Sequence, residues 1–192
     1  MKPLVTNWTI KASTEPSTAV ALASVVAARL DELNVETVFA RAVDPVLAPG
    51  VGTDPGEGDE WPAVHDRLLD SEIPAIASPA RLGQPSSVAQ RVPERMDAVI
   101  SETDDEDRPA ACDRVVVVTG NEDGAHHGIS EISGALADIG CTIPWRLGAG
   151  PGPGYLEDER GRDWVHSTGR TMADNLCGVA RALAAPPLKP SG

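Results

Sequence analysis

A run of four valines, Val115 to Val118, constrains the fold of this chain more than any other feature of its sequence. β-Branched residues favour extended backbone, and an uninterrupted apolar run is typical of a strand in the buried middle of a parallel sheet. A polar segment, Thr119 to His127, follows the run directly, and a helical pattern of apolar residues then continues to Gly140. A strand, a polar loop and a helix in this order predict one βα unit of an α/β domain.

Strand and helix patterns alternate along the rest of the chain. The predicted strands cover residues 4–7, 36–43, 73–77, 115–118 and 141–143. The predicted helices cover residues 19–33, 61–70 and 86–100, the segment that ends at Gly140, and residues 163 to about 184. Pro93 is expected to kink the third helix or to end it early. The alternation predicts a doubly wound parallel sheet, and the length of 192 residues fits a single domain over residues 1–192.

Composition excludes several classes of function. With 16 basic and 29 acidic residues the net charge is −13, which repels a phosphate backbone and makes nucleic acid an unexpected partner. No apolar run is long enough to span a bilayer, and no signal-peptide pattern is visible, so we expect no membrane partner. The cysteines Cys112, Cys141 and Cys177 are widely spaced and form no metal-type pair. A reducing cytoplasm is therefore the predicted location.

Ligands of doubly wound sheets lie outside the carboxyl ends of the strands, where the strand order reverses. This rule directs attention to three loops, residues 8–18, 78–86 and 119–127. The first loop places hydroxyls and backbone amides before a helix N-terminus, which suits a phosphate, although an ordinary helix-capping loop has the same composition. In the second loop Arg81 is the single charged residue, and it is interpreted either as an anion or ring contact or as a surface arginine.

The third loop carries two glycines, an amide, two carboxylates and two histidines in one turn. Glycine permits a close approach of backbone to a ligand, and Asn121 can meet the polar edge of a heteroaromatic ring. Carboxylates beside His126 and His127 would also suit a metal ion, but adjacent histidines rarely point at one ion, so no metal site is predicted. The structural alternative is a helix-capping Asp123 with surface histidines.

Four segments read in order resemble flavodoxin-family NAD(P)H-dependent oxidoreductases of the FMN-reductase type. They are residues 7–17 (NWTIKASTEPS), 82–89 (LGQPSSVA), 94–97 (ERMD) and 119–127 (TGNEDGAHH). The resemblance implies a flavodoxin-like three-layer α/β fold with five parallel strands in the order 2-1-3-4-5. It also implies FMN and NAD(P)H as cofactors and a homodimer or higher homo-oligomer.

The resemblance also assigns residues to the flavin. Residues that would surround the phosphate are Thr9, Lys11, Ser13, Ser17 and Thr18. Residues that would line one side of the ring are Pro79, Ala80, Arg81, Leu82 and Gly83. Residues that would contact its polar edge or close the pocket are Thr119, Gly120, Asn121, Asp123 and His126.

The implied activity is hydride transfer from NAD(P)H to the flavin, followed by reduction of a quinone, a flavin or another small organic acceptor.

Three features of the sequence depart from the pattern of this family: Arg81 replaces an aromatic residue, prolines occupy strand and helix positions, and the segment after Pro144 is short. A second hypothesis is therefore an enzyme with lost or weakened FMN binding that catalyses a non-redox biosynthetic step. Its candidate acid–base or anion-holding groups are His126, His127, Asp123, Glu122 and Arg81. A third is a carrier or binding module. The natural substrate and the choice between NADH and NADPH are not predicted.

Overall fold

The computed structural model describes residues 1–13, 15–54, 56–102, 117–120, 125–144, 148–149 and 159–185. The strands are β1 (Pro3–Asn7), β2 (Val38–Arg41), β3 (Ile73–Ala77), β4 (Ala80–Arg81), β5 (Gln84–Pro85), β6 (Val117–Gly120) and β7 (Gly148–Ala149). The helices are α1 (Thr18–Glu32), α2 (Trp61–Asp70), α3 (Ser87–Met96), α4 (Ala125–Asp138) and α5 (Glu159–Leu183), and a 3-10 helix covers Asp97–Ser101.

Five parallel strands form the main sheet in the order β2-β1-β3-β6-β7. This is the predicted order 2-1-3-4-5, with β6 and β7 as the fourth and fifth strands, and the predicted α/β fold is confirmed. Residues 141–143, the predicted fifth strand, contain a bridge residue, Thr142, and the described edge strand of the sheet is β7 at Gly148 and Ala149. Cys141 follows the end of α4, where its amide donates to the carbonyl of Leu136 at 3.0 Å. Of the valine run, Val117 and Val118 lie in β6, and the earlier two lie outside the described residues.

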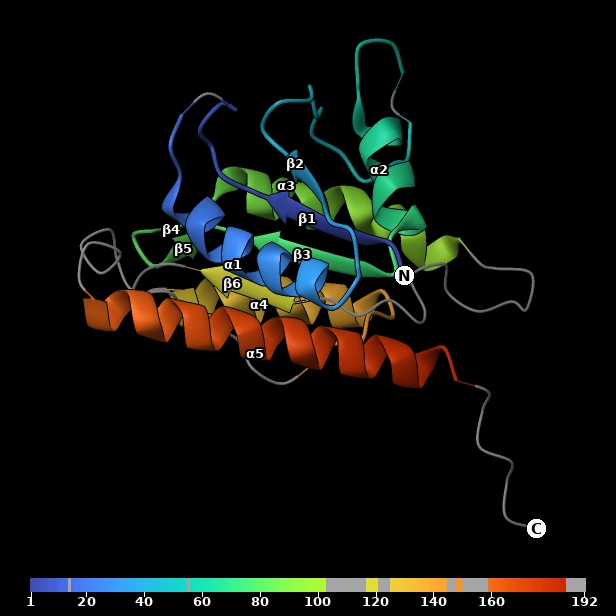
Figure 1. Ribbon diagram of the computed structural model, residues 1–192. Coiled ribbons are helices and arrows are strands. Elements are labelled where there is room, and N and C mark those ends of the chain that lie inside the picture. Colours follow the sequence, from blue (N-terminus) through green and yellow to red (C-terminus); the bar gives the residue numbers. More distant parts are fainter. Residues whose placement is uncertain are drawn as a thin grey trace.

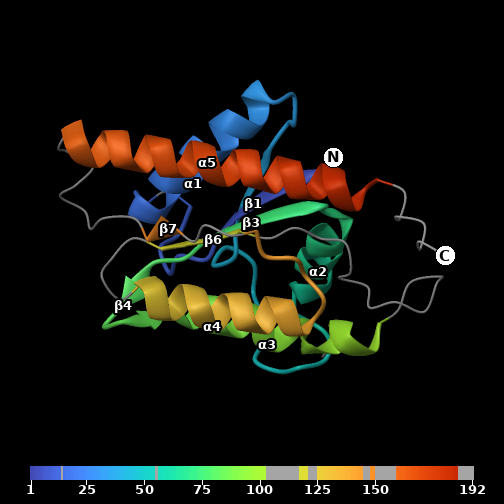
Figure 2. The same cartoon turned by 90° about the horizontal axis from the view of Figure 1, so that it is seen from below.

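Helices cover both faces of the sheet, so the chain forms three layers (Figures 1 and 2). Side chains of β1 alternate between them: Leu4 faces the core under α2, α3 and α4, and Val5 faces the core under α1 and α5. Cysteines mark the same division, because Cys141 is buried in the first core and Cys177 in the second. Burial raises the pKa of the Cys177 thiol.

The prolines that interrupt regular elements are accommodated at their ends. Pro74 pairs with Leu4 of β1 near the start of β3, and the described pairs of β3 with β6 cover Ala75 to Ala77. Pro93 lies inside α3, which ends three residues later at Met96 and tightens into the 3-10 helix, as expected for a helix that a proline ends early. Gly140, where the helical pattern was predicted to end, follows α4 and has a φ of 97°, the left-handed conformation common after a helix.

A buried ion pair fixes the loop between β2 and α2. The guanidinium of Arg95 on α3 is fully buried and lies 2.6 Å from the carboxylate of Asp59, whose side chain is 3% exposed. The other carboxylate oxygen of Asp59 accepts from the amides of Ala48 and Trp61, at 3.0 and 3.3 Å. Arg95 also lies over the ring of Trp61, at 5.5 Å from its centroid. One buried carboxylate therefore holds the loop to both α2 and α3.

Exposed ion pairs connect α1 to α5 across the other face. Glu32 lies 2.8 Å from Arg29 and 2.9 Å from Arg170, and Arg29 also lies 2.8 Å from Asp174. Hydrogen bonds from Arg170 and Arg29 lower the pKa of the Glu32 carboxyl from its usual 4.5 to about 2.

Replacing Glu32 by glutamine is expected to weaken the response of stability to acid. Because the carboxyl has a lower pKa when folded, its contribution is present above pH 4.5 and is lost as the pH falls towards about 2. Urea unfolding at pH 6 and pH 3 measures this response, and Asp31→Asn on the same helix is the control. An equal acid response in the Glu32 variant and the parent protein would contradict the assignment.

Candidate functional site

The carboxyl ends of β1, β3 and β6 lie side by side at one edge of the sheet. Asn7 of β1 is in register with Ala77 of β3, and Ala77 is in register with Thr119 of β6. The three loops predicted to carry the ligand leave the sheet from these three strands. The structure therefore brings the start of each predicted loop to one place, at the point where the strand order reverses.

Trp8 ties the first two loops together. Its side chain is 1% exposed, and its backbone amide donates to the carbonyl of Ala77 at 2.8 Å. The hydroxyl of Ser86 donates to the carbonyl of Trp8 and accepts from the amide of Ala89 at 3.0 Å. Ser86 is thus the N-cap of α3, and it also fixes the start of the first loop.

Replacing Ser86 by alanine is expected to lower the free energy of unfolding by about 1–2 kcal/mol, because a buried cap and a buried carbonyl each lose a partner. Thermal and urea unfolding measure the loss. The neighbouring exposed Ser87 is the matched control, and Ser87→Ala should change stability by less than about 0.5 kcal/mol. Equal effects of the two substitutions would contradict the role of Ser86.

The first loop contains the predicted phosphate residues. Thr9 is buried, and its hydroxyl accepts from the amide of Lys11 at 3.3 Å. The ammonium of Lys11 donates to the carbonyl of Pro16 at 2.9 Å, so this side chain folds over its own loop. Ser17 is the N-cap residue of α1, but its hydroxyl makes no capping hydrogen bond. The backbone of Thr18 starts α1, and its side chain lies outside the described part of the chain.

Two charged residues that were not predicted as site residues hold this loop. Arg41 ends β2, and one guanidinium nitrogen donates to the carbonyls of Lys11, Ala12 and Glu15. The carboxylate of Asp44 accepts from the amide of Ser13 at 3.2 Å and from the Ser13 hydroxyl. Their signal in the sequence is their position directly after the second strand, which the strand order places beside the first.

The second loop is a short hairpin of β4 and β5. Its two turn residues, Leu82 and Gly83, have φ of 52° and 77°, as a tight hairpin turn requires. The Leu82 side chain is fully exposed at the tip, whereas Pro79 and Ala80 are buried. Arg81 lies in β4, and its side chain lies outside the described residues.

The third loop starts at Gly120 and leads into α4. The backbones of Thr119 and Gly120 form the end of β6, and residues 121–124, with Asn121 and Asp123, lie outside the described residues. His126 is exposed in the first turn of α4, and the neighbouring His127 pairs with Glu131 at 3.1 Å.

The hairpin packs against the first turn of α4. A side chain at Gly128 would begin 3.4 Å from the backbone nitrogen of Pro85. The second and third loops therefore lie next to each other. Within the described ranges, no group of three or more metal-ligating side chains is present.

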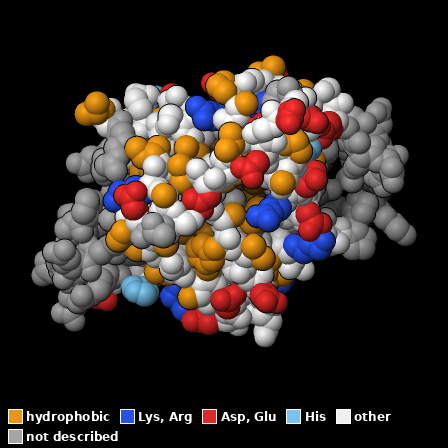
Figure 3. All heavy atoms as spheres, turned by 90° about the horizontal axis from the view of Figure 1, so that it is seen from above, with side chains coloured by type: hydrophobic (Ala, Val, Ile, Leu, Met, Phe, Trp, Pro, Cys, Tyr) orange, Lys and Arg blue, Asp and Glu red, His pale blue; other side chains and the backbone are white. Residues whose placement is uncertain are grey.

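A cavity of about 550 Å3 lies beside the first loop, between α1 and the end of β2. Its lining includes Asn7, Ser13, Arg41, Asp44 and Phe39. Asn7 is 1% exposed, and neither its amide nitrogen nor its oxygen has a hydrogen-bond partner in the described structure. Figure 3 shows the molecule from the side that is uppermost in Figure 1, where hydrophobic side chains lie across the middle with acidic ones among and around them.

Fold and strand order together define a protein with a flavodoxin-like fold. The structure of RosB with bound 8-demethyl-8-formylriboflavin-5'-phosphate has a TM-score of 0.86 and 24% identity, and covers 98% of this chain and 82% of that one. A flavone reductase has a TM-score of 0.68 and 14% identity, with coverage of 98% and 66%. A flavodoxin from Streptococcus pneumonia TIGR4 has a TM-score of 0.60 and 10% identity, with coverage of 92% and 98%. The resemblance noted in the sequence is confirmed at the level of the fold.

Two curated proteins are similar in sequence. The 8-demethyl-8-aminoriboflavin-5'-phosphate synthase of Streptomyces davaonensis is 26% identical over 205 residues, which cover 97% of this chain and 80% of that protein. The divalent metal cation transporter MntH of Mycobacterium bovis is 35% identical over 201 residues, which cover 97% of this chain. The chain spans 29% of the length of that transporter. No protein-family model matches the chain. No helix in the described ranges is both long and apolar enough to cross a membrane.

Proposed function

We propose that this protein is an enzyme that binds a flavin 5'-phosphate at the carboxyl edge of its sheet and transfers electrons from NAD(P)H to a small organic acceptor. The observation that carries the proposal is the first loop, where Ser13 presents two donors to an anion at the start of α1. Similarity over 97% of the chain to a synthase of a riboflavin 5'-phosphate derivative supports the same ligand class.

The first loop fits a phosphate group. Its Ser13 amide and hydroxyl already bind a carboxylate, and α1 starts within a few residues, so its positive end adds to the attraction. Lys11 keeps one positive charge against the loop. Thr9, Ser17 and Thr18 complete the set that we assign to the phosphate.

The protein positions and shields the flavin in this proposal. When bound, FMN supplies a ring that exchanges a hydride with a nicotinamide. Pro79 to Gly83 would line one side of that ring, and Thr119 to His126 would contact its polar edge. The hairpin is fixed for this task by its packing against α4, and Trp8 keeps the phosphate loop and the hairpin at a constant separation.

A second function deserves the same test, because RosB combines a TM-score of 0.86 with a bound flavin phosphate intermediate. In this alternative the flavin phosphate is the substrate of a biosynthetic step, and no nicotinamide takes part. His126, Asp123 and Arg81 would then be the acid–base and anion-holding residues.

One titration separates the two functions. FMN is added to the purified protein and its fluorescence is followed, and NADPH or NADH is then added without oxygen. Quenching followed by bleaching supports the oxidoreductase. Quenching without bleaching supports the flavin phosphate as a substrate, and no quenching at saturating FMN would contradict both.

Replacing His126 by alanine is expected to leave the rate of flavin bleaching by NAD(P)H within about threefold, because hydride transfer needs no acid–base side chain. His127→Ala is the matched control on the same turn. A loss of a hundredfold or more, the size expected for a missing general acid or base, would contradict a hydride transfer that needs no acid–base side chain.

Oligomeric state, location and extent remain predictions. A homodimer or higher homo-oligomer, a cytoplasmic location and a single domain over residues 1–192 belong to the proposal. Sedimentation equilibrium tests the oligomeric state, and limited proteolysis tests whether residues 1–192 form a single domain.

A further inference from the structure

The first loop holds an anion that belongs to the chain itself. Both donors of Ser13, its amide and its hydroxyl, are directed to the two oxygens of the Asp44 carboxylate. A phosphate group would use donors of this type in the same two-point geometry. Asp44 therefore occupies part of the position that the proposed function gives to the flavin phosphate.

Among the described residues, Arg41 forms no ion pair with this carboxylate. Its guanidinium donates to three backbone carbonyls of the loop, of Lys11, Ala12 and Glu15. Among the described residues Asp44 forms no ion pair, and its side chain is exposed. A phosphate that arrives beside it meets a like charge, which is unfavourable at short range.

Asn7 gives a second and independent indication that this place receives a ligand. Asn7 is among the residues that line the same cavity as Ser13, Arg41 and Asp44, and both polar atoms of its side chain are buried without a hydrogen-bond partner in the described structure. A buried amide without partners is costly, and native structures rarely keep one without a reason. A ligand group that enters the cavity can supply the missing partner.

We propose that Asp44 sets the affinity of the site for phosphorylated flavins, as an internal competitor that the incoming phosphate displaces from Ser13. The inference rests on the proposed function, because it assumes that the first loop binds the phosphate. Asn7 then provides an amide donor in the vacated space. A flavin without a phosphate leaves Asp44 in place, so the competitor acts on FMN and not on riboflavin. The consequence is a site that binds a flavin phosphate weakly enough to exchange it.

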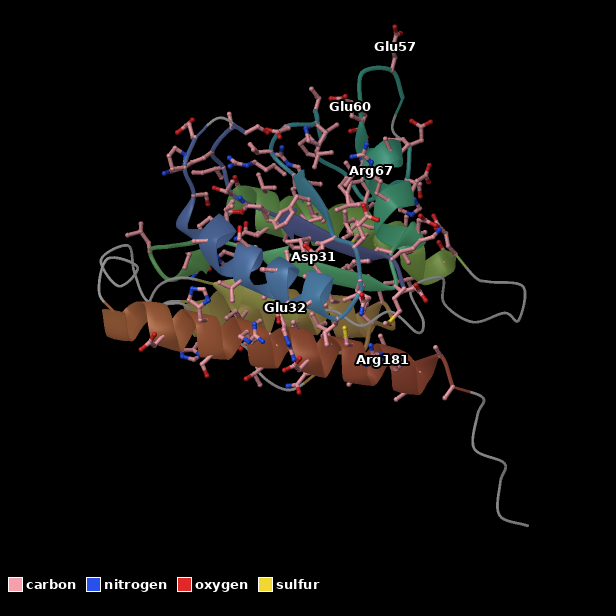
Figure 4. All side chains as sticks on the ribbon, in the orientation of Figure 1. Asp31, Glu32, Glu57, Glu60, Arg67 and Arg181 are labelled. Atoms are coloured by element: carbon pink, nitrogen blue, oxygen red, sulfur yellow. The ribbon has the colours of Figure 1, made fainter. Side chains whose placement is uncertain are left out.

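The test compares Asp44→Asn with the parent protein in titrations with FMN and riboflavin. We expect the dissociation constant for FMN to fall about tenfold while that for riboflavin stays within about twofold. Glu57→Gln is the matched control, because it removes one acidic charge from the same loop. Figure 4 shows Glu57 at the far tip of that loop, directed away from the sheet. The Glu57→Gln variant should leave the dissociation constants for FMN and for riboflavin unchanged.

A second measurement does not depend on flavin. Inorganic phosphate at millimolar concentration should raise the melting temperature of the Asp44→Asn variant by more than that of the parent or the Glu57→Gln variant. Asp44→Ala gives the same comparison if the asparagine variant folds poorly.

The outcomes separate the inference from the function on which it rests. An unchanged ratio of FMN to riboflavin affinity, or weaker FMN binding by the variant, overturns the role of Asp44 and leaves the proposed function standing. If neither the parent protein nor any variant binds FMN or riboflavin, the proposed function fails. The phosphate-dependent melting temperatures then still decide whether Asp44 competes with an anion for Ser13.

Discussion

Replacing Asp59 by alanine is expected to lower the free energy of unfolding by about 3–5 kcal/mol, because it leaves the fully buried Arg95 without its charged partner. The amides of Ala48 and Trp61 lose their acceptor in the same step. Two buried nitrogens of Arg95, Nε and Nη1, already lack a hydrogen-bond partner in the described structure. The guanidinium therefore has no other partner there to replace Asp59. Urea unfolding followed by circular dichroism measures the loss.

Asp54→Ala is the matched control for this substitution. Asp54 lies in the same loop and is exposed, and among the described residues its carboxylate accepts one local hydrogen bond, from the amide of Gly56 at 2.9 Å. We expect a loss below about 1 kcal/mol for this variant. Adding Arg95→Met to Asp59→Ala should restore part of the stability, since the unpaired charge is removed. A loss no larger than that of Asp54→Ala would contradict the importance of the ion pair.

Replacing Arg41 by methionine is expected to weaken FMN binding by about ten- to a hundredfold, because three loop carbonyls lose the group that holds them. Titration by flavin fluorescence measures the affinity. Limited proteolysis of residues 8–17 gives a readout without flavin, and cleavage there should become faster.

Arg67→Met separates positioning from charge. Arg67 lines the same cavity from α2, as Figure 4 places it, but donates no hydrogen bond to the first loop in the described residues. It should weaken FMN binding by less than about threefold. Equal losses for the two arginines would mean that overall charge, and not the order of the loop, determines binding.

Most of the fold could be predicted because local patterns in the sequence specify its strands and helices. The apolar run that ends in Val118, the helical spacing up to Gly140 and the β-branched segment around Val38 specify the elements, and the alternation of βα units specifies their order. The last strand is different, because the two described residues of β7, Gly148 and Ala149, leave almost no pattern in the sequence. The prediction started this strand at Cys141, a residue that completes the end of α4.

From the sequence, the site could be predicted only in its position at the strand ends and in the residues that directly follow those strands. Ser13 was found because a run of hydroxyl residues before a helix is a local signal. Arg41 and Asp44 were missed because their contacts with the first loop join residues about thirty apart in the chain, brought together by the pairing of β1 with β2. The buried pair of Asp59 and Arg95 was missed for the same reason, since an acidic loop reads as solvated until its partner is known.

Cys177 makes the opening of α5 measurable without an added label. Its thiol is buried between α1 and α5, and burial raises its pKa, so both access and ionisation oppose its reaction with a thiol reagent in the folded state. Modification at neutral pH then requires the helix to leave the sheet. The rate of alkylation of the peptide that contains Cys177, read by mass spectrometry, reports how often that face of the protein opens, and whether a flavin bound at the distant strand ends makes it open less often.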